Sequence, residues 1–248
     1  MKQYLAETNI LDFSDPAIQK LVSQFDSKHL NEYEKIGIAY QFVKDDIQFG
    51  YNKSDAISAS EVLKDGYGQC NTKGNLLMAL LRAMDIPCRF HGFTIERSLQ
   101  KGAIPNYLFW LAPEYIIHSW VEVYFDNRWI NLEGFILDNS YLSVIQDQFS
   151  DASSFCGYGV ATKCLSNPEV EWNGRDTYIQ KEGIHDDSGV FDSPDDFYAA
   201  EGTNLTGIKR LAYEYAFRHL INLNVKRVRK SLAPNNKEEI VRGFRKSG

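Results

Sequence analysis

The feature that most constrains this chain is the stretch from Gly66 to Phe90, where two glycines precede a cysteine and an apolar helical pattern follows it. The apolar residues recur at the spacing of one helix face, and they are Leu76, Leu77, Leu80, Leu81 and Met84. This pattern places Cys70 in the first turn of a buried helix. There, free backbone N–H groups and the positive end of the helix dipole favour the nucleophilic thiolate. The alternative is that Cys70 is only a small buried apolar residue.

Length and composition describe an ordinary globular protein. The 248 residues, 44% of them hydrophobic, are enough to bury a large core, and no internal repeat is found. No run approaches the roughly 20 apolar residues that span a bilayer, and the N-terminus lacks a cleavage signal. The four cysteines form no C-x-x-C pair, which fits a reducing compartment. We therefore predict a cytoplasmic protein that does not contact a membrane.

The charge of the chain is unevenly distributed. The net charge is −6, which argues against nucleic acid as a partner. Residues 207–248 hold eleven Lys and Arg against three Glu, so this segment carries +8 and the rest of the chain carries −14. The basic segment could bind an anionic partner, but the simpler expectation is a solvated helix face that packs on an acidic body.

Helices are predicted before the cysteine. Asp15 and Pro16 form a helix-start signal, and Asn31 opens a second amphipathic pattern. After a short alternating segment at residues 46–51, a brief helical turn is expected at residues 59–63, directly before the glycines that lead to the cysteine.

Strands are predicted after the cysteine helix. Residues 88–95 alternate, residues 118–125 alternate strictly, and residues 129–133 continue as a second strand after a turn. His118 and Glu133 are thereby expected on adjacent antiparallel strands, with the histidine away from the aliphatic face. A lone histidine is usually structural, but here a helix-start cysteine, a strand histidine and a strand carboxylate follow one another.

That order suits acyl transfer through a thioester. A thiol attacks an amide carbonyl when an imidazole takes its proton and later protonates the leaving amine, and a carboxylate on the far ring nitrogen orients the imidazole. Cys70, His118 and Glu133 fit these three roles. The oxyanion needs donors. The Cys70 backbone N–H is the natural first donor, and the candidates for a second are the side chains of Gln48, Tyr51 and Gln69.

The sequence G-Y-G-Q-C with D-I-P-C-R-F, followed by H-S-W-V-E-V-Y-F-D-N-R-W-I-N-L-E, resembles the core of the transglutaminase-like superfamily. The resemblance covers roughly residues 33–138. It implies an α+β papain-like fold, with the nucleophile at the start of a central helix and its partners on an antiparallel sheet. Carried over to this chain, Cys70 is the nucleophile and His118 the base. Members include cross-linking enzymes, cysteine proteases, amidases, peptide N-glycanases and inactive relatives.

The third residue departs from the family, which usually has aspartate where this chain has Glu133. Asn131 and Asp138 are the other candidates for orienting the histidine. A simple hairpin would place Glu133 about opposite Val121 rather than opposite His118. A bulge or a strong twist could bring the two together, and the extra methylene of glutamate reaches further than aspartate would.

The rest of the chain is less informative. We expect residues 1–138 to form the helical front and catalytic core, and residues 139–248 a loop-rich extension packed on it. Cys156 and Cys164 are weak zinc candidates, and the acidic residues 185–196 are expected to be a solvated loop without a calcium-binding pattern. The last helix is expected near residues 205–231, followed by a tail from Pro234. Its docking stripe is predicted to be Ile208, Leu211, Ala212, Tyr215, Ala216, His219, Leu220 and Leu223.

The sequence thus predicts a cysteine-dependent enzyme that transfers the acyl group of an amide to water or to an amine. Its substrate would be a peptide, a protein or a small amide, and no cofactor or metal is expected. The alternative is a catalytically inactive module of the same fold that binds a peptide or protein. Retention of both Cys70 and His118 favours the enzyme.

Overall fold

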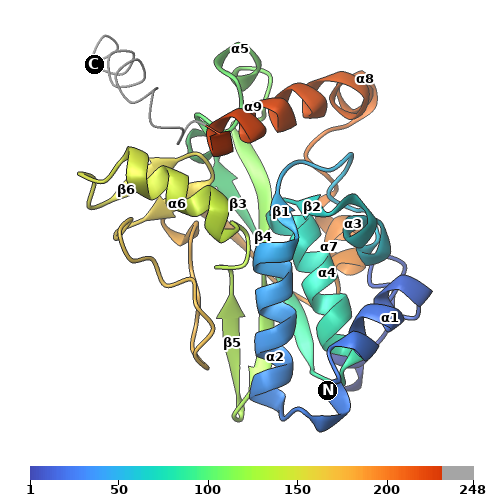
Figure 1. The fold of residues 1–248 in the computed structure, drawn as a ribbon. Helices are drawn as coiled ribbons and strands as arrows, with labels where there is room; N and C mark the ends of the chain where they lie inside the picture. Colours follow the sequence, from blue (N-terminus) through green and yellow to red (C-terminus); the bar gives the residue numbers. More distant parts are fainter. Residues whose placement is uncertain (231–248) are drawn as a thin grey trace.

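The structure is a computed structural model, and it describes residues 1–230 (Figure 1). The helices are α1 (Pro16–Gln24), α2 (Glu32–Gln41), α3 (Ala59–Asp65), α4 (Cys70–Ala83), α5 (Asn106–Phe109), α6 (Asn139–Gln148), α7 (Pro194–Glu201), α8 (Gly207–Ala212) and α9 (Arg218–Lys230). The strands are β1 (Gln48–Phe49), β2 (Tyr67–Gly68), β3 (Cys88–Glu96), β4 (Tyr115–Phe125), β5 (Arg128–Leu132), β6 (Phe155–Gly157), β7 (Val160–Thr162) and β8 (Ile184–Phe191). The predicted α+β class is confirmed.

The main sheet has four antiparallel strands in the order β5-β4-β3-β8. In its centre Phe93 lies opposite His118, and Phe90 opposite Val121. Side chains alternate between the two faces, and the face that carries Phe90 and Val121 is covered by α4. The helix α7 lies on the same face, where Gly92 permits close approach because a Cβ there would meet the Phe197 ring at 2.2 Å.

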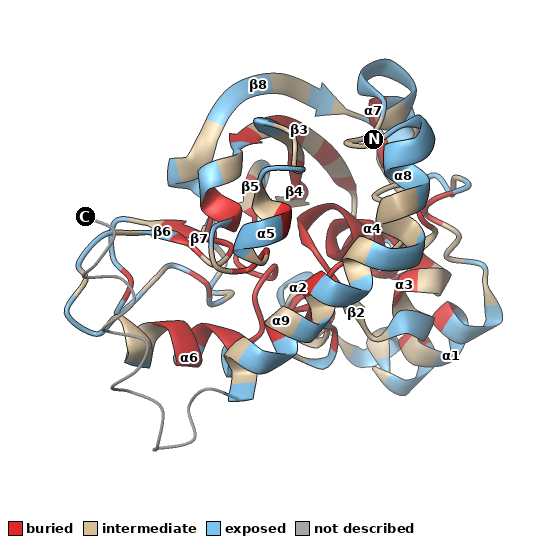
Figure 2. Cartoon of the chain, turned by 90° about the horizontal axis from the view of Figure 1, so that it is seen from above, coloured by how far each residue is buried: buried red, intermediate tan, exposed pale blue. Residues whose placement is uncertain are grey.

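Helix α4 is surrounded by protein. All residues from Cys70 to Arg82 are buried, because α2, α3 and the sheet enclose the helix (Figures 1 and 2). Its polar side chains therefore need internal partners. The Lys73 ammonium donates to the carbonyls of Lys44 and Ile136, both at 3.0 Å. Burial lowers the pKa of Lys73 to about 7 against the opposing influence of nearby carboxylates.

The predicted helix starts are confirmed. The Asp15 carboxylate accepts from the Ala17 N–H at 2.7 Å, and Pro16 occupies the first position of α1. At the start of α2, the Asn31 side chain accepts from the Glu34 N–H at 3.0 Å while the Glu34 carboxylate accepts from the Asn31 N–H at 2.9 Å. This reciprocal capping satisfies two free donors at once, which is why the sequence signal is reliable.

The acidic region expected to be a loop is instead largely a strand. Residues Ile184–Phe191 form β8, the edge strand of the main sheet, with Val190 opposite His91. The strand was not predicted because its acidic side chains face outwards, so the segment lacks the alternation of apolar and polar residues that indicates a strand. Charged residues on an edge strand also hinder pairing with other chains, so the acidic composition of β8 suits its position at the edge of the sheet.

The C-terminal helix is present, but the predicted docking stripe is wrong. Seven of the eight residues in the predicted stripe are exposed. The large apolar ones among them have exposed fractions from 39% to 86%, and they are Ile208, Leu211, Tyr215, Leu220 and Leu223. The side facing the body is formed by Tyr213, Phe217, Ile221 and Val225, four residues apart. A π-helical turn, Tyr213–Phe217, separates α8 from α9 and widens the repeat, which a period of 3.6 cannot predict.

Residues from both predicted segments contribute to one hydrophobic core. The cluster that contains Leu77 and Leu80 of α4 also contains Phe197 of α7 and Ile221 of α9. The boundary at residue 138 remains a prediction, and the tail predicted from Pro234 lies outside the described residues. Among residues 1–230, none of the helices is both long and apolar enough to cross a membrane.

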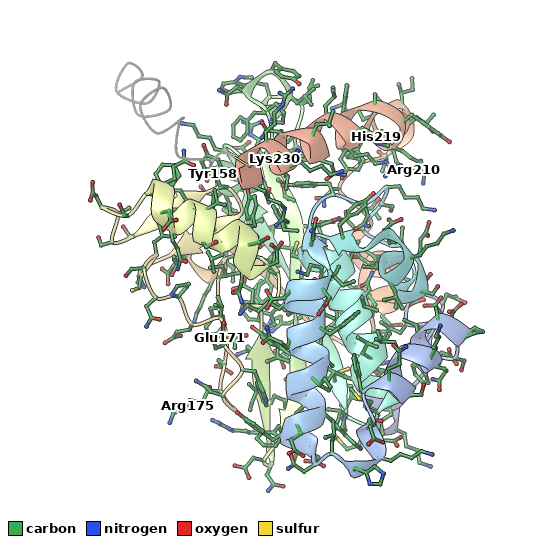
Figure 3. All side chains as sticks on the ribbon, viewed as in Figure 1. Tyr158, Glu171, Arg175, Arg210, His219 and Lys230 are labelled. Carbon is green, nitrogen blue, oxygen red and sulfur yellow. The ribbon has the colours of Figure 1, made fainter. Side chains whose placement is uncertain are left out.

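Two ion pairs attach distant segments to this core. The buried Lys44 pairs with Glu171, which comes from the long connection after β7 (Figure 3). Arg229 of α9 pairs with Asp138 in front of α6, with 2.6 Å between Nη2 and Oδ2. The Asp138 carboxylate also accepts from the Phe49 N–H at 2.8 Å, so α9, α6 and β1 meet at one carboxylate.

We predict that Asp138→Asn destabilises the protein in a pH-dependent way. Burial alone would raise the pKa of Asp138, but the hydrogen bonds and charge of Arg229 and the Phe49 N–H lower it to about 2. The carboxylate therefore stabilises the fold above the unfolded pKa of about 3.9, and this contribution is lost as the pH falls through 2. At pH 6 the variant is expected to have a free energy of unfolding about 2 kcal/mol below that of the wild type, and at pH 3 this difference should be smaller by about 1 kcal/mol.

Urea unfolding of wild type and variant between pH 3 and 6 measures this difference. Asp147→Asn, which changes an exposed carboxylate on α6, is the matched control. A difference in unfolding free energy that stays constant across this range would contradict the assigned ion pair.

Candidate active site

Cys70 occupies the first position of α4, as the sequence predicts. The two glycines before Cys70 are required for different structural reasons. Gly66 ends α3 in the left-handed conformation (φ 69°), and a Cβ on Gly68 would lie 2.7 Å from the Thr72 hydroxyl oxygen. The Thr72 hydroxyl accepts from the Gln69 N–H at 3.1 Å and so caps the helix. As the first helical residue, Cys70 has an N–H with no acceptor within the helix.

His118 lies on β4 and is fully buried. Its Nε2 lies 2.9 Å from Glu133 Oε1, while Nδ1 is buried without a well-aligned hydrogen bond to any described residue. Burial alone would lower the pKa of His118. The charge of the Cys70 sulfur and its hydrogen-bonding interaction with the ring, together with Glu133, raise the pKa to about 10. The ring is therefore held between the sulfur and the carboxylate.

The expected position of Glu133 on the strand is wrong by one residue. Strand β5 ends at Leu132, which is the residue opposite Val121, and Glu133 lies beyond the ladder. The chain turns there, so the carboxylate reaches His118 without a bulge in the hairpin. The connection after β7 holds this turn, because the Glu133 N–H donates to the Thr177 carbonyl at 3.0 Å.

The Glu133 carboxylate is oriented by backbone groups. Its Oε2 accepts from the Ile179 N–H at 2.9 Å and from the Gln180 N–H at 3.0 Å, which leaves Oε1 for His118. The carboxylate is fully buried, and a buried charge of this kind requires such partners. Both donors come from the extension, outside the segment that carries the sequence motifs.

The other two candidates for orienting the histidine bind elsewhere. The Asn131 amide donates to the Tyr178 hydroxyl at 2.8 Å. Asp138 caps α6, where it accepts from the Tyr141 N–H at 3.0 Å and pairs with Arg229. Both alternatives are therefore incorrect for this structure.

The three candidate oxyanion donors differ in position. Gln48 is exposed on β1 and does not line the cavity beside the cysteine, so its candidacy is incorrect. Tyr51 and Gln69 do line this cavity. The Tyr51 hydroxyl donates to the Gln100 side chain, and the Gln69 amide donates to Asp55 Oδ1 at 3.0 Å. The Tyr51 hydroxyl would have to leave Gln100 to donate to an oxyanion, whereas the Gln69 amide has a second N–H besides the one bound to Asp55.

Asn71 joins the cysteine helix to the histidine strand. Its amide donates to the Ile117 carbonyl at 3.1 Å, and its carbonyl oxygen accepts from the Ser119 hydroxyl at 2.8 Å. The residue after Cys70 thus binds both neighbours of His118. Asn71 is not among the residues predicted from the sequence, although its position directly after the cysteine is the one sequence signal for it.

Asp55 and Asn204 complete this network. Asp55 Oδ1 accepts from the amides of Gln69 and Asn71, at 3.0 and 3.2 Å, and its Oδ2 accepts from the Asn204 amide at 2.9 Å. The Asn204 carbonyl oxygen accepts from the Ile117 N–H at 2.7 Å. Both residues stand in irregular segments without a motif, so no sequence signal indicated them.

A cavity of about 340 Å³ opens beside Cys70. Its walls include the start of α4, the segment around α5, the beginning of β4 and the face of the α8–α9 region that is turned to the body. In Figures 1 and 2 this C-terminal helical segment crosses above the N-terminal end of α4. The residue Cys70 is 7% exposed.

Metal sites are not indicated in the described part of the chain. No group of three or more His, Cys, Asp or Glu side chains there could hold a metal ion. Cys156 and Cys164 are free and exposed, on β6 and in the loop after β7.

The comparisons with known proteins agree with the sequence motifs. Residues 19–134 match the family model of the Transglutaminase-like superfamily, so the resemblance predicted from the sequence motifs is confirmed. No curated protein matches the chain.

One similar solved structure is a protein of Cytophaga hutchinsonii described as a "putative cysteine protease". It is 14% identical with a TM-score of 0.44, over 86% of this chain and 48% of that one. The chain therefore spans about half the length of that protein.

We predict that Glu133→Gln lowers the pKa of His118 by roughly one to three units from its value of about 10, because it removes an adjacent negative charge. The folded pKa lies above the unfolded value of about 6.5. The charged ring therefore stabilises the fold fully below pH 6.5, and this contribution is lost as the pH rises through 10. An NMR titration of the His118 ring measures the shift.

Glu122→Gln is the matched control, because Glu122 binds Arg89 and His91 on the same sheet and does not bind His118. If both variants left the His118 titration unchanged, the assignment of Glu133 as its charge partner would be wrong.

We predict that Asn71→Ala destabilises the protein by about 2 kcal/mol, because it leaves the Ser119 hydroxyl and the Ile117 carbonyl without their partner. Chemical unfolding measures this change. Asn106→Ala, at an exposed position of α5, is the control and is expected to change stability by less than about 0.5 kcal/mol. Equal effects of the two substitutions would rule out the bridging role.

Proposed function

We propose that this protein is a cysteine-dependent enzyme that transfers the acyl group of an amide substrate through a thioester. The observation that carries the proposal is the position of His118, buried between the Cys70 sulfur and the Glu133 carboxylate. A nucleophile, a proton acceptor and an orienting carboxylate are the three parts that this chemistry needs.

In the first half of the reaction, the Cys70 proton resides on the His118 ring and the sulfur attacks the carbonyl carbon of the amide. The new C–S bond converts the carbonyl into a tetrahedral oxyanion. The Cys70 N–H at the start of α4 is available to this oxyanion, because the helix provides no acceptor for it. The C–N bond then breaks, and the imidazolium gives its proton to the departing amine.

In the second half, a water molecule or an amine attacks the thioester carbon. His118 takes the proton of this nucleophile, the C–S bond breaks, and the sulfur leaves as the thiolate that pairs with the imidazolium. Glu133 keeps Nε2 protonated throughout, because its Oε1 accepts a hydrogen bond from the Nε2–H group and its Oε2 is occupied by two backbone N–H groups. The tautomer with Nδ1 free for the sulfur is thereby maintained.

The superfamily match and the transglutaminase-like core support a peptide or protein as the substrate. Hydrolysis and transfer differ only in which nucleophile reaches the thioester. The alternative of an inactive module that binds a peptide would leave the same fold without the proton transfer, so it is tested by the reactivity of the thiol.

We expect iodoacetamide to alkylate Cys70 at pH 6 at least tenfold faster than the exposed Cys164, and His118→Ala to remove this advantage. Peptide mass spectrometry quantifies both sites in the same sample, so Cys164 is an internal control. Amide cleavage with and without a biotinylated primary amine then separates hydrolysis from transfer. A Cys70 that reacts equally in both proteins would exclude the enzyme and favour the binding module.

A further inference from the structure

The size and the apolar wall of the cavity beside Cys70 limit the kinds of substrate that it can bind. Its volume of about 340 Å³ is far larger than an amide group and lies in the range of ligand pockets. Much of its wall is aliphatic or aromatic. Buried wall residues include Ile104, Leu108 and Ile221, with exposed fractions of 4–7%.

Most of the polar side chains in the wall are already bound to protein groups. The Tyr51 hydroxyl donates to Gln100, the Tyr213 hydroxyl donates to the Asn52 carbonyl at 3.1 Å, and Lys53 pairs with Glu61. Asp55 is occupied by three side-chain amides. A ligand that enters the cavity therefore meets mainly apolar surface.

The rim of the cavity carries large apolar side chains beside the exposed Lys209 and Arg210. Trp110, Leu111 and Ile208 line it and are nevertheless 76%, 53% and 86% exposed. They approach from two sides, Trp110 and Leu111 from the segment after α5, and Ile208 from α8. Large apolar side chains gathered at the opening of a pocket mark a binding surface. Along the same C-terminal segment, Arg210 lies near the start and Lys230 at the end (Figure 3).

We propose that the substrate is a peptide segment with a bulky apolar side chain on the residue whose carbonyl is attacked or on its immediate neighbour. This side chain enters the cavity under Tyr213, Phe217 and Ile221, while the carbonyl lies at the Cys70 sulfur in the wall. The inference rests on the proposed function and adds the specificity that the C-terminal helices provide.

The test uses dipeptidyl chloromethyl ketones, which place a peptide beside the thiol that they alkylate. Gly-Gly, Phe-Gly and Gly-Phe reagents are compared on the full chain, each rate being divided by the rate of the same reagent with glutathione. We expect at least one phenylalanine reagent to exceed the Gly-Gly reagent tenfold or more, since each buried methylene group is worth a factor of about four.

Two variants test whether the cavity causes this preference. Ala212→Trp fills the cavity and Ile208→Ser removes an exposed apolar side chain from its rim, so the ratio of the phenylalanine to the glycine rate should fall at least threefold in each. The second substitution is on the surface and keeps the test valid if the first does not fold. The controls are Ala216→Trp and Leu223→Ser, exposed residues outside the cavity wall, which should preserve the wild-type ratio.

The possible results separate the two proposals. If Cys70 alkylation depends on His118 but all three peptides react equally, the proposed function stands and the apolar specificity is overturned. If N-decyl iodoacetamide outpaces every peptide reagent after the same correction, the cavity takes a fatty acyl chain and the peptide assignment is wrong. If alkylation does not depend on His118, the proposed function itself fails.

Discussion

The candidate site depends on the hydrogen bonds that join the start of α4 to strand β4. Asn71 binds the residues on both sides of His118, and Asp55 binds the residues on both sides of Cys70. A helix and a strand that pack through apolar side chains can slide by fractions of an ångström, whereas several buried polar contacts allow few arrangements. The position of the start of α4 relative to β4 is therefore fixed by side chains other than Cys70 and His118.

The extension is part of the site. Asn204 binds Asp55 and the Ile117 N–H, the N–H groups of Ile179 and Gln180 hold the Glu133 carboxylate, and the α8–α9 region covers the cavity. The family match ends at residue 134. The segment that matches the family thus carries the three candidate residues, and the extension supplies groups that orient Glu133 and part of the cavity wall.

Sequence patterns predicted the parts of the fold that depend on local physics. Caps at Asp15 and Asn31, the start of α4 at Cys70 and the strand alternation around His118 follow from the geometry of one helix turn or one strand. The patterns failed where a distant partner decides the outcome. The acidic strand β8 pairs with β3, and the π-helical turn at Tyr213 redirects the C-terminal helix.

The sequence by itself determined the class of fold and the order of the three candidate residues, Cys70, His118 and Glu133. The reason is that the helix and strand around each of them follow from the spacing of apolar residues within a short segment. Only the tertiary structure decided that Glu133 rather than Asn131 or Asp138 meets the histidine. The reason is that Glu133 lies just beyond the end of β5, where a turn held by the extension sets its direction. A contact of this kind joins residues with no common period, so no local pattern encodes it.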